Sequence, residues 1–232
     1  MTNLFQNALR HILPDGDKRS RRTILVKQLG ERDRHRIRKH FLALDAADRL
    51  LRFGTALPDE QVIAYVDKLD FKRDTIYGVY NRTFRLDAVA HLAFSPKNSV
   101  PGHFETEKEM VAEFGVSVLK HARGLGIGSR LFERAAIHCR NNDVDTLYMH
   151  YLTRNKAIMH IAKKAGMSVE RDYSESEAYL KILPASPGSV LQEAIEEQFA
   201  TIDYTIKAQA RAATKFFESA KKDEKHEPEP GA

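Results

Sequence analysis

The sequence predicts an α/β fold with a single mixed, mostly antiparallel central sheet flanked by helices and followed by a C-terminal amphipathic helix. Three observations lead to this prediction. Strand-like and helix-like segments are interleaved along the 232 residues rather than grouped. A glycine-rich turn joins the longest expected strand, Met110 to Leu119, to an amphipathic helix. After Pro187 the pattern changes to one long apolar stripe at helical spacing.

The first half of the fold follows from hydrophobic spacing and turn residues. Apolar residues recur at three and four in two segments, which predicts helices at 33–44 and from Pro58 to Leu69. Two β-rich segments are separated by the turn-like Asn81-Arg82, which predicts an antiparallel hairpin. The strands expected in this half are 23–29, 75–80, 86–94 and 110–119.

The second half repeats the same signals. Ile127, Leu131, Ala135 and Cys139 recur every four residues and predict a buried helix face. A strand at 146–152, a helix at 155–165 and two strands at 168–171 and 178–183 complete the pattern, and Gly166 fits the C-cap of that helix.

These elements divide the chain into four segments. Residues 1–22 are expected to be a leader with a basic linker, and residues 23–184 to be the globular domain. Residues 185–220 are expected to form the amphipathic helical extension. Residues 221–232 are charged, contain two prolines and are expected to be a disordered tail.

Composition narrows the class of protein. The net charge is +5, but 37 basic and 32 acidic residues interleave, and no basic stretch carries the aromatic residues that single-strand binders use, so nucleic acid is not the expected partner. No apolar run approaches the length of a membrane span, and the N-terminus lacks a signal-peptide pattern. Cys139 is the only cysteine, so no intramolecular disulfide and no cysteine-built metal site are expected. A cytoplasmic location is predicted.

The segment from Gly115 to Gly128 carries the chemistry. A strand enters a turn with Gly124, Gly126 and Gly128, and the turn opens a helix. Glycines permit close backbone approach, and the first N–H groups of a helix are free to bind an anion such as a pyrophosphate. A Walker A loop would require a lysine after Gly128, and a Gly-x-Gly-x-x-Gly fingerprint starting at Gly124 would require glycine at Ser129.

The pattern Arg123-x-x-Gly126-x-Gly128 after an alternating strand resembles motif A of the GNAT acetyltransferases. Asn155 at the next strand-to-helix junction, with Lys164 and Gly166 after it, resembles motif B of the same superfamily. The resemblance extends from about Thr23 to Leu183 and implies the GNAT fold.

The resemblance also implies a co-substrate, acetyl-CoA, and no metal. In this family two central strands diverge, and the pantetheine arm of CoA lies between them. The matching positions imply that backbone groups of Val116 and Val118 bind pantetheine and that the turn binds the pyrophosphate. The cofactor-binding residues implied in this way are Val116, Val118, Arg123, Gly124, Gly126, Gly128, Ser129 and Asn155.

Catalysis is implied less completely. Glu113, just before the cofactor segment, matches the position where many members carry the general base, and strand alternation puts Glu109 on the same face. The family often has a tyrosine seven residues after the motif B asparagine, but here that position is Ala162. Tyr148, Tyr151 and His160 are the alternatives for the general acid. A thiol ionises near about pH 8 to 9, so a thiolate can leave without help.

The function expected from these residues is N-acetylation by direct transfer from acetyl-CoA to a primary amine, on a small molecule or a protein. The alternative is a catalytically weak GNAT-fold protein that senses acyl-CoA or binds a protein through its C-terminal helix. The apolar stripe of that helix, from Ile195 to Phe216, is expected either to dock on its own domain or to form a homodimer.

Overall fold

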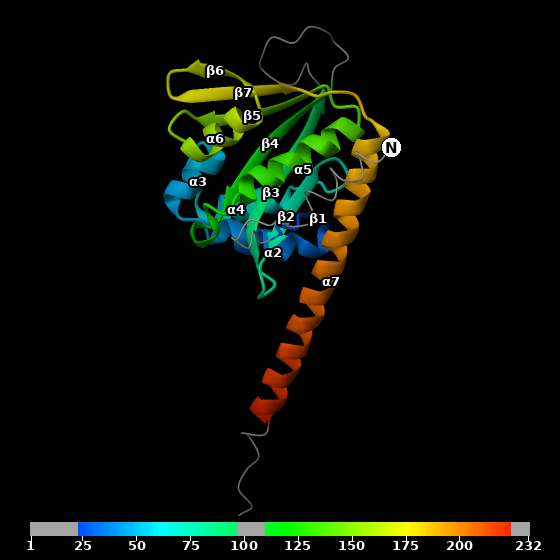
Figure 1. Cartoon of the computed structure of the whole chain (residues 1–232). Coiled ribbons are helices and arrows are strands. Elements are labelled where there is room, and N and C mark those ends of the chain that lie inside the picture. Colours follow the sequence, from blue (N-terminus) through cyan, green and yellow to red (C-terminus); the bar gives the residue numbers. More distant parts are fainter. Residues whose placement is uncertain (1–22, 97–109, 224–232) are drawn as a thin grey trace, which may run out of the picture.

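The computed structural model describes residues 23–96 and 110–223, in which seven strands form a single sheet (Figure 1). The strand order is β1-β2-β3-β4-β5-β7-β6. All neighbouring strands are antiparallel except β4 and β5, which are parallel. The strands are β1 (Lys27–Leu29), β2 (Thr75–Tyr80), β3 (Leu86–Pro96), β4 (Met110–Val118), β5 (Thr146–Leu152), β6 (Ser168–Asp172) and β7 (Glu175–Lys181). The predicted mixed, mostly antiparallel sheet is confirmed.

Helices cover both faces of this sheet. The helices are α2 (Arg34–Leu42), α3 (Ala46–Phe53), α4 (Asp59–Asp67), α5 (Ile127–Asn141), α6 (Lys156–Lys164) and α7 (Pro187–Asp223), with short 3-10 turns at Glu31–Asp33 and Lys120–Ala122. Residues of α2 and α4 share one hydrophobic cluster with β1–β3, and residues of α5 and α6 share another with β3–β5. The domain therefore has three layers.

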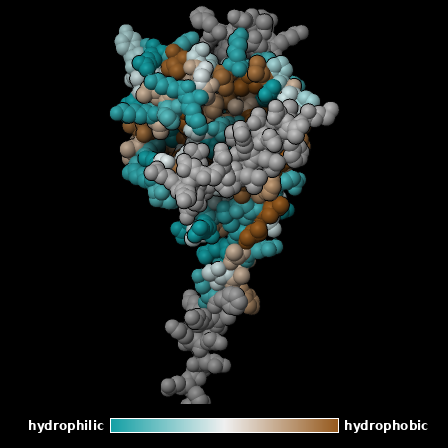
Figure 2. Space-filling model, in the orientation of Figure 1, coloured by the Kyte–Doolittle hydropathy of each residue, from teal (hydrophilic) through white to brown (hydrophobic). Residues whose placement is uncertain are grey.

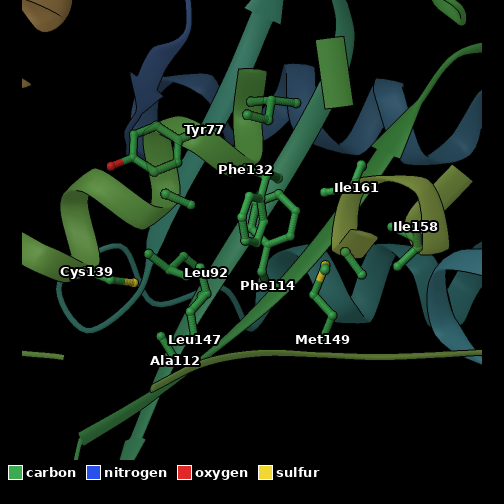
Figure 3. Packing of buried hydrophobic residues seen from close by; sticks show 14 of the residues in the cluster. Tyr77, Leu92, Ala112, Phe114, Phe132, Cys139, Leu147, Met149, Ile158 and Ile161 are labelled. Carbon is green, nitrogen blue, oxygen red and sulfur yellow. The ribbon is translucent and has the colours of Figure 1, made fainter. Parts of the chain in front are cut away.

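The second cluster is the core directly beneath the glycine-rich turn. Phe114 of β4 and Phe132 of α5 meet edge to face, with ring centroids 5.3 Å apart (Figure 3). Ile158 and Ile161 of α6 extend the same cluster. This apolar contact fixes α5 and α6 against the sheet.

Several predicted boundaries change in the structure. The first strand begins at Lys27 rather than Thr23, and a separate helix, α3, follows α2. Strand β7 begins at Glu175 rather than Ala178, because its polar first residues pair with β6 as a hairpin. The predicted leader (1–22), the last residues of the predicted tail (224–232) and Glu109 lie outside the described residues.

Helix α7 packs against α5 and β1 through a mixed face of glutamates, the buried Ala200 and Tyr204, and then continues beyond the domain (Figure 1). Glu193, Glu196 and Glu197 point to the domain, where they meet the buried guanidinium of Arg134. Helix α7 therefore docks on its own domain, but not through the apolar stripe. Of the two alternatives expected for the stripe, docking is wrong, because the opposite face of α7 contacts the domain and turns the stripe outward. Phe199, Ile202 and Ile206 are 48%, 55% and 60% exposed. Figure 2 shows brown, hydrophobic atoms along α7 where it leaves the domain.

Within the two described ranges, no helix combines the length and the apolarity that crossing a bilayer requires.

Candidate active site

The sheet opens between β4 and β5. The two strands pair only where Val111–Glu113 faces Thr146–Tyr148, and β4 continues to Val118 without a partner on this side. The Met110 carbonyl accepts from Asp145 next to β5, whereas the Leu119 N–H donates to Asp87 next to β3. Because backbone groups alternate along a strand, those of Val116 and Val118 face the side from which β5 has diverged.

A cavity with a volume of about 470 Å³ lies at this open edge. Its walls come from β4, the glycine-rich turn, the first turn of α5, α6 and the α2–α3 segment. All eight predicted cofactor-binding residues line it: Val116, Val118, Arg123, Gly124, Gly126, Gly128, Ser129 and Asn155. The fold thus brings together residues that lie up to 39 positions apart (155 − 116).

The turn requires glycine for two different reasons. Gly124 and Gly126 have φ angles of 76° and 79°, a left-handed conformation that other residues rarely adopt. Gly126 caps α5, so the N–H groups of the first helical turn point out of the helix. Gly128 is constrained by packing instead, because a Cβ there would lie 3.1 Å from Cδ1 of Ile161. The result is a helix N-terminus with free N–H groups, the kind of position at which an anion binds favourably.

Arg123 does not present a free charge to the cavity. Its Nη2 lies 2.7 Å from Oδ1 of Asp48, and its Nε donates to the Val118 carbonyl at 3.0 Å. The guanidinium therefore ties the glycine-rich turn to α3 and to the end of β4.

Asn155 has a comparable structural position. Its Oδ1 accepts from the Ile158 N–H at 3.3 Å and caps α6, and its Nδ2 donates to the Leu51 carbonyl at 3.4 Å. The side chain is buried at the cavity wall. Asn155 thus joins the start of α6 to α3 across the cavity.

The residues considered for proton transfer are placed differently. Glu113 is exposed, does not line the cavity and accepts a hydrogen bond from the Tyr148 hydroxyl at 3.2 Å. Burial raises the pKa of Tyr148, and the neighbouring Glu113 raises it further. Ala162 is fully buried in the core. Of the three alternative acids, only His160 lines the cavity.

A polar network lies beside the cavity. The family resemblance implies that residues 49–53 shape the acceptor pocket, but sequence reasoning missed the network that Arg52 joins there. Arg52, Tyr65, His91 and Asp74 come from α3, α4, β3 and the segment before β2, and they are joined by successive hydrogen bonds. Only Arg52 of these lines the cavity. No spacing in the sequence links them, because the contact arises from strand pairing and helix packing. The sequence feature that comes nearest to revealing the network is Gly115, because a glycine within a strand often marks a place where another group approaches the backbone closely.

Other chemistry-bearing residues have structural positions. Cys139 is buried in the core, and desolvation raises the pKa of its thiol to about 12, so it is not a nucleophile at neutral pH. The described part of the chain contains no group of three or more His, Cys, Asp or Glu side chains that could hold a metal ion.

An open strand edge beside a glycine-rich helix start is the arrangement of an acyl-CoA-dependent acyltransferase. The family model of the acetyltransferase (GNAT) family matches residues 29–167, more than half of the chain. The protein belongs to the GNAT acetyltransferase family, whose members are acyl-CoA-dependent N-acyltransferases. The comparison with curated proteins gives no match.

Solved structures of acetyltransferases share the fold. The GNAT domain of S. lividans PAT is 16% identical, with a TM-score of 0.56 over 68% of this chain and 89% of that one. RimL, a ribosomal L7/L12 α-N-protein acetyltransferase in complex with CoA, is 15% identical, with a TM-score of 0.53 over 69% and 95%. Spermidine N-acetyltransferase from Vibrio cholerae, in complex with CoA and spermine, is 15% identical, with a TM-score of 0.51 over 68% and 95%. At these identities the likeness concerns the fold.

Proposed function

We propose that the cavity binds acetyl-CoA and that the protein transfers the acetyl group directly to a primary amine. One observation carries the proposal: the unpaired edge of β4 and the glycine-rich helix start open onto the same cavity. A pantetheine arm has amides that pair with a strand edge, and a pyrophosphate is the anion that a helix N-terminus binds. Two structures with the same fold are described in complex with CoA.

The eight cofactor-binding residues act in three ways. The backbones of Val116 and Val118 bind the pantetheine amides, and the backbone N–H groups from Gly124 to Ser129 bind the pyrophosphate. Arg123 and Asn155 hold the cavity walls in place through Asp48, Val118, Ile158 and Leu51.

The chemical step requires little from side chains. The amine nitrogen attacks the thioester carbonyl, the C–S bond breaks, and the products are an amide and the CoA thiol. Proximity supplies much of the rate, and a backbone N–H of the open edge stabilises the oxyanion. Glu113 accepts the proton of the amine through water, because it does not line the cavity itself. His160, on the cavity wall, protonates the departing thiolate.

Ser129 offers a test of the pyrophosphate site that leaves the fold intact. A glutamate in the first turn of α5 stabilises the helix by about 0.3–1 kcal/mol but repels a bound pyrophosphate. Ser129→Glu should therefore keep its thermal midpoint and bind acetyl-CoA at least about 10-fold more weakly by calorimetry. Ser129→Gln is the matched control, because it has the same size without the charge.

Two outcomes would contradict the proposal. Wild type that binds neither acetyl-CoA nor CoA has no such site, and equal binding by the Glu and Gln variants places the pyrophosphate elsewhere. The sensor alternative is favoured by the buried Ala162 at the usual acid position. Tight acetyl-CoA binding without thiol release in the presence of any amine would support it.

We further propose that the outward stripe of α7 joins two copies of the chain. Ile195, Phe199, Ile202 and Ile206 follow the alternating steps of four and three that a coiled-coil seam requires, and Phe199, Ile202 and Ile206 are exposed. A second copy presents the same spacing and is therefore complementary to it.

A further inference from the structure

Arg52 brings a positive charge to the cavity wall next to the open strand. It lies in α3, and its guanidinium packs against the backbone of Gly115 in β4. A Cβ built on Gly115 would lie 2.7 Å from Cζ of Arg52, so any larger residue would displace the guanidinium. The glycine within β4 thus makes room for Arg52 beside Val116.

The guanidinium has aromatic neighbours, and no carboxylate of the described residues lies within ion-pair distance of it, although Glu113 acts electrostatically on the same Tyr65 and His91. The rings of Phe53, Tyr65 and Phe41 have centroids 4.9, 5.7 and 5.8 Å from its Cζ. Nη2 donates to the Tyr65 hydroxyl at 2.9 Å, whereas Nε is buried without a hydrogen-bond partner. Among the residues that the structure describes, Arg52 has no ion-pair partner.

The other charges of the cavity cancel. Asp48 and Arg123 line the same cavity and pair with each other at 2.7 Å. Arg52 is therefore the cation that remains on the wall without a counter-ion. Arg52 is half-buried, with its Nε atom withdrawn from solvent. Such a cation is costly to leave unpaired, and a guanidinium binds a carboxylate in bidentate fashion.

A hydrogen-bond chain holds Arg52 in position. Asp74 is buried and accepts from His91 Nε2 at 3.1 Å, so His91 Nδ1 is left to accept from the Tyr65 hydroxyl at 2.8 Å. The Tyr65 oxygen then accepts from Arg52. Burial lowers the pKa of His91, with a further contribution from Arg52, and a neutral imidazole is the form that this direction of bonding requires.

We propose that Arg52 binds a carboxylate of the acceptor, so that the substrate is a small amino acid or a related amine with an anionic group close to its nitrogen. The inference rests on the proposed function, in which the pantetheine arm runs from the glycine-rich turn along Val118 and Val116, so that the thioester at its end lies close to Gly115. Neighbouring residues of a strand are about 3.3 Å apart, so an anion at Gly115 and an amine at the thioester are separated by only a few atoms. A polyamine or a lysine side chain of a protein has no anion at that spacing.

Paired acceptors test the inference directly. Wild type is assayed for thiol release with acetyl-CoA and the standard amino acids, β-alanine and the matching amines without the carboxylate, such as phenylalanine against phenethylamine. The carboxylate-bearing member of each accepted pair should have a kcat/KM roughly 100-fold higher. Arg52→Gln should abolish this preference and leave the Kd of acetyl-CoA unchanged.

Two further variants make the result specific. Gly115→Ala adds a methyl group that displaces only the end of the Arg52 side chain, so it should weaken the preference while the domain stays folded. Arg82→Gln removes the same charge from the exposed β2–β3 turn and should leave the preference unchanged. Thermal midpoints show whether each variant is folded.

The possible failures are distinguishable. Equal use of paired amines, or a preference that survives in Arg52→Gln, overturns the acceptor site alone. Turnover of none of the amines by a protein that binds acetyl-CoA overturns the acceptor site and the proposed transfer together, and supports the sensor alternative. Loss of acetyl-CoA binding in Arg52→Gln would show that Arg52 binds the co-substrate, and this result also overturns the acceptor site. Absence of acetyl-CoA binding in wild type removes the proposed function and this inference with it.

Discussion

His40 shows how one buried residue sets the stability of the site at low pH. It is 3% exposed, its Nδ1 donates to the Leu86 carbonyl at 3.0 Å, and its Nε2 accepts from Ser117 Oγ at 2.7 Å. Desolvation lowers its pKa from 6.5 to about 4. Ser117 lies on the cavity wall between Val116 and Val118, so the neutral imidazole supports the open strand edge.

The direction of this pKa change predicts acid sensitivity. A folded-state pKa below the unfolded value gives stability that is complete above about pH 6.5 and is lost as the pH falls towards 4. The difference between 6.5 and about 4 corresponds to about 3 kcal/mol at ~1.36 kcal/mol per pKa unit. The loss of unfolding free energy with falling pH is measured by urea unfolding of wild type and His40→Gln at several pH values between 7.5 and 4. The variant should be less stable at pH 7.5 but lose less free energy of unfolding over this range, and parallel curves would contradict the prediction.

At the scale of elements, Arg134 determines how α7 sits on the domain. Its guanidinium is 1% exposed, and its nitrogens lie 2.7, 3.6 and 4.0 Å from carboxylate oxygens of Glu193, Glu197 and Glu196. Although burial raises the pKa of Glu193, hydrogen bonds from His138, Arg134 and Asn141 lower it to about 2, so this carboxylate stays charged at neutral pH.

Removing the cation should release the start of α7. Arg134→Met removes the cation that the three carboxylates share. Each carboxylate keeps another partner in His138, Arg130 or Lys27, so the loss should be about 1.5–3 kcal/mol of unfolding free energy. Limited proteolysis should then cleave α7 faster than in wild type. Arg140→Met is the control on the same helix, because Arg140 is less buried and, among the described residues, donates only to the Pro184 carbonyl. Equal effects of the two variants would show that α7 is held in another way.

The sequence predicted elements better than their contacts. Strands 75–80 and 146–152 match β2 and β5, because apolar alternation and flanking turns are local signals. The glycine-rich turn was equally readable, since positive φ angles and close packing require glycine wherever they occur. The docked face of α7 was not readable, because its glutamates look like an ordinary solvated face until Arg134 is placed opposite them.

The same distinction applies to the site. The eight predicted residues among those that line the cavity belong to motifs with a fixed spacing, so a local pattern located them. Arg52 and Tyr65 meet His91 and Asp74 only through tertiary packing, and the pattern of any one segment does not reveal it. Glu113 was placed on the correct strand, but its distance from the cavity depends on how β4 and β5 diverge.

For the whole molecule, the two faces of α7 have different roles: one face docks on the domain, and the other is exposed. Its polar face holds the domain through Glu193, Glu197 and Tyr204, which reaches Asp33 at 3.2 Å. The opposite face carries the exposed apolar residues Phe199, Ile202 and Ile206, which we propose as the dimer seam. Docking and self-association therefore use different side chains of α7. No described residue of α7 lines the cavity, so a dimer formed through this helix would leave the residues that line the cavity of each chain unchanged.

This arrangement predicts a concentration-dependent dimer. The apolar stripe from Ile195 to Phe216 is only about three heptads long. Two copies should therefore associate in the micromolar range and separate on dilution. Sedimentation at increasing concentration should show the mass rise from 26.4 kDa towards twice that value. Phe199→Glu combined with Ile206→Glu should keep the protein monomeric, because charges replace two exposed apolar residues of the seam.

The control places the same charges off the seam. Ala194→Glu combined with Thr201→Glu changes two exposed positions of α7 that lie outside the four-and-three spacing, and this variant should associate like wild type. Neither pair touches the cavity, so acetyl-CoA binding should be equal in all three proteins. If wild type stays monomeric at every concentration, the stripe does not join two copies of the chain. Equal association of both double variants would place the interface on another surface.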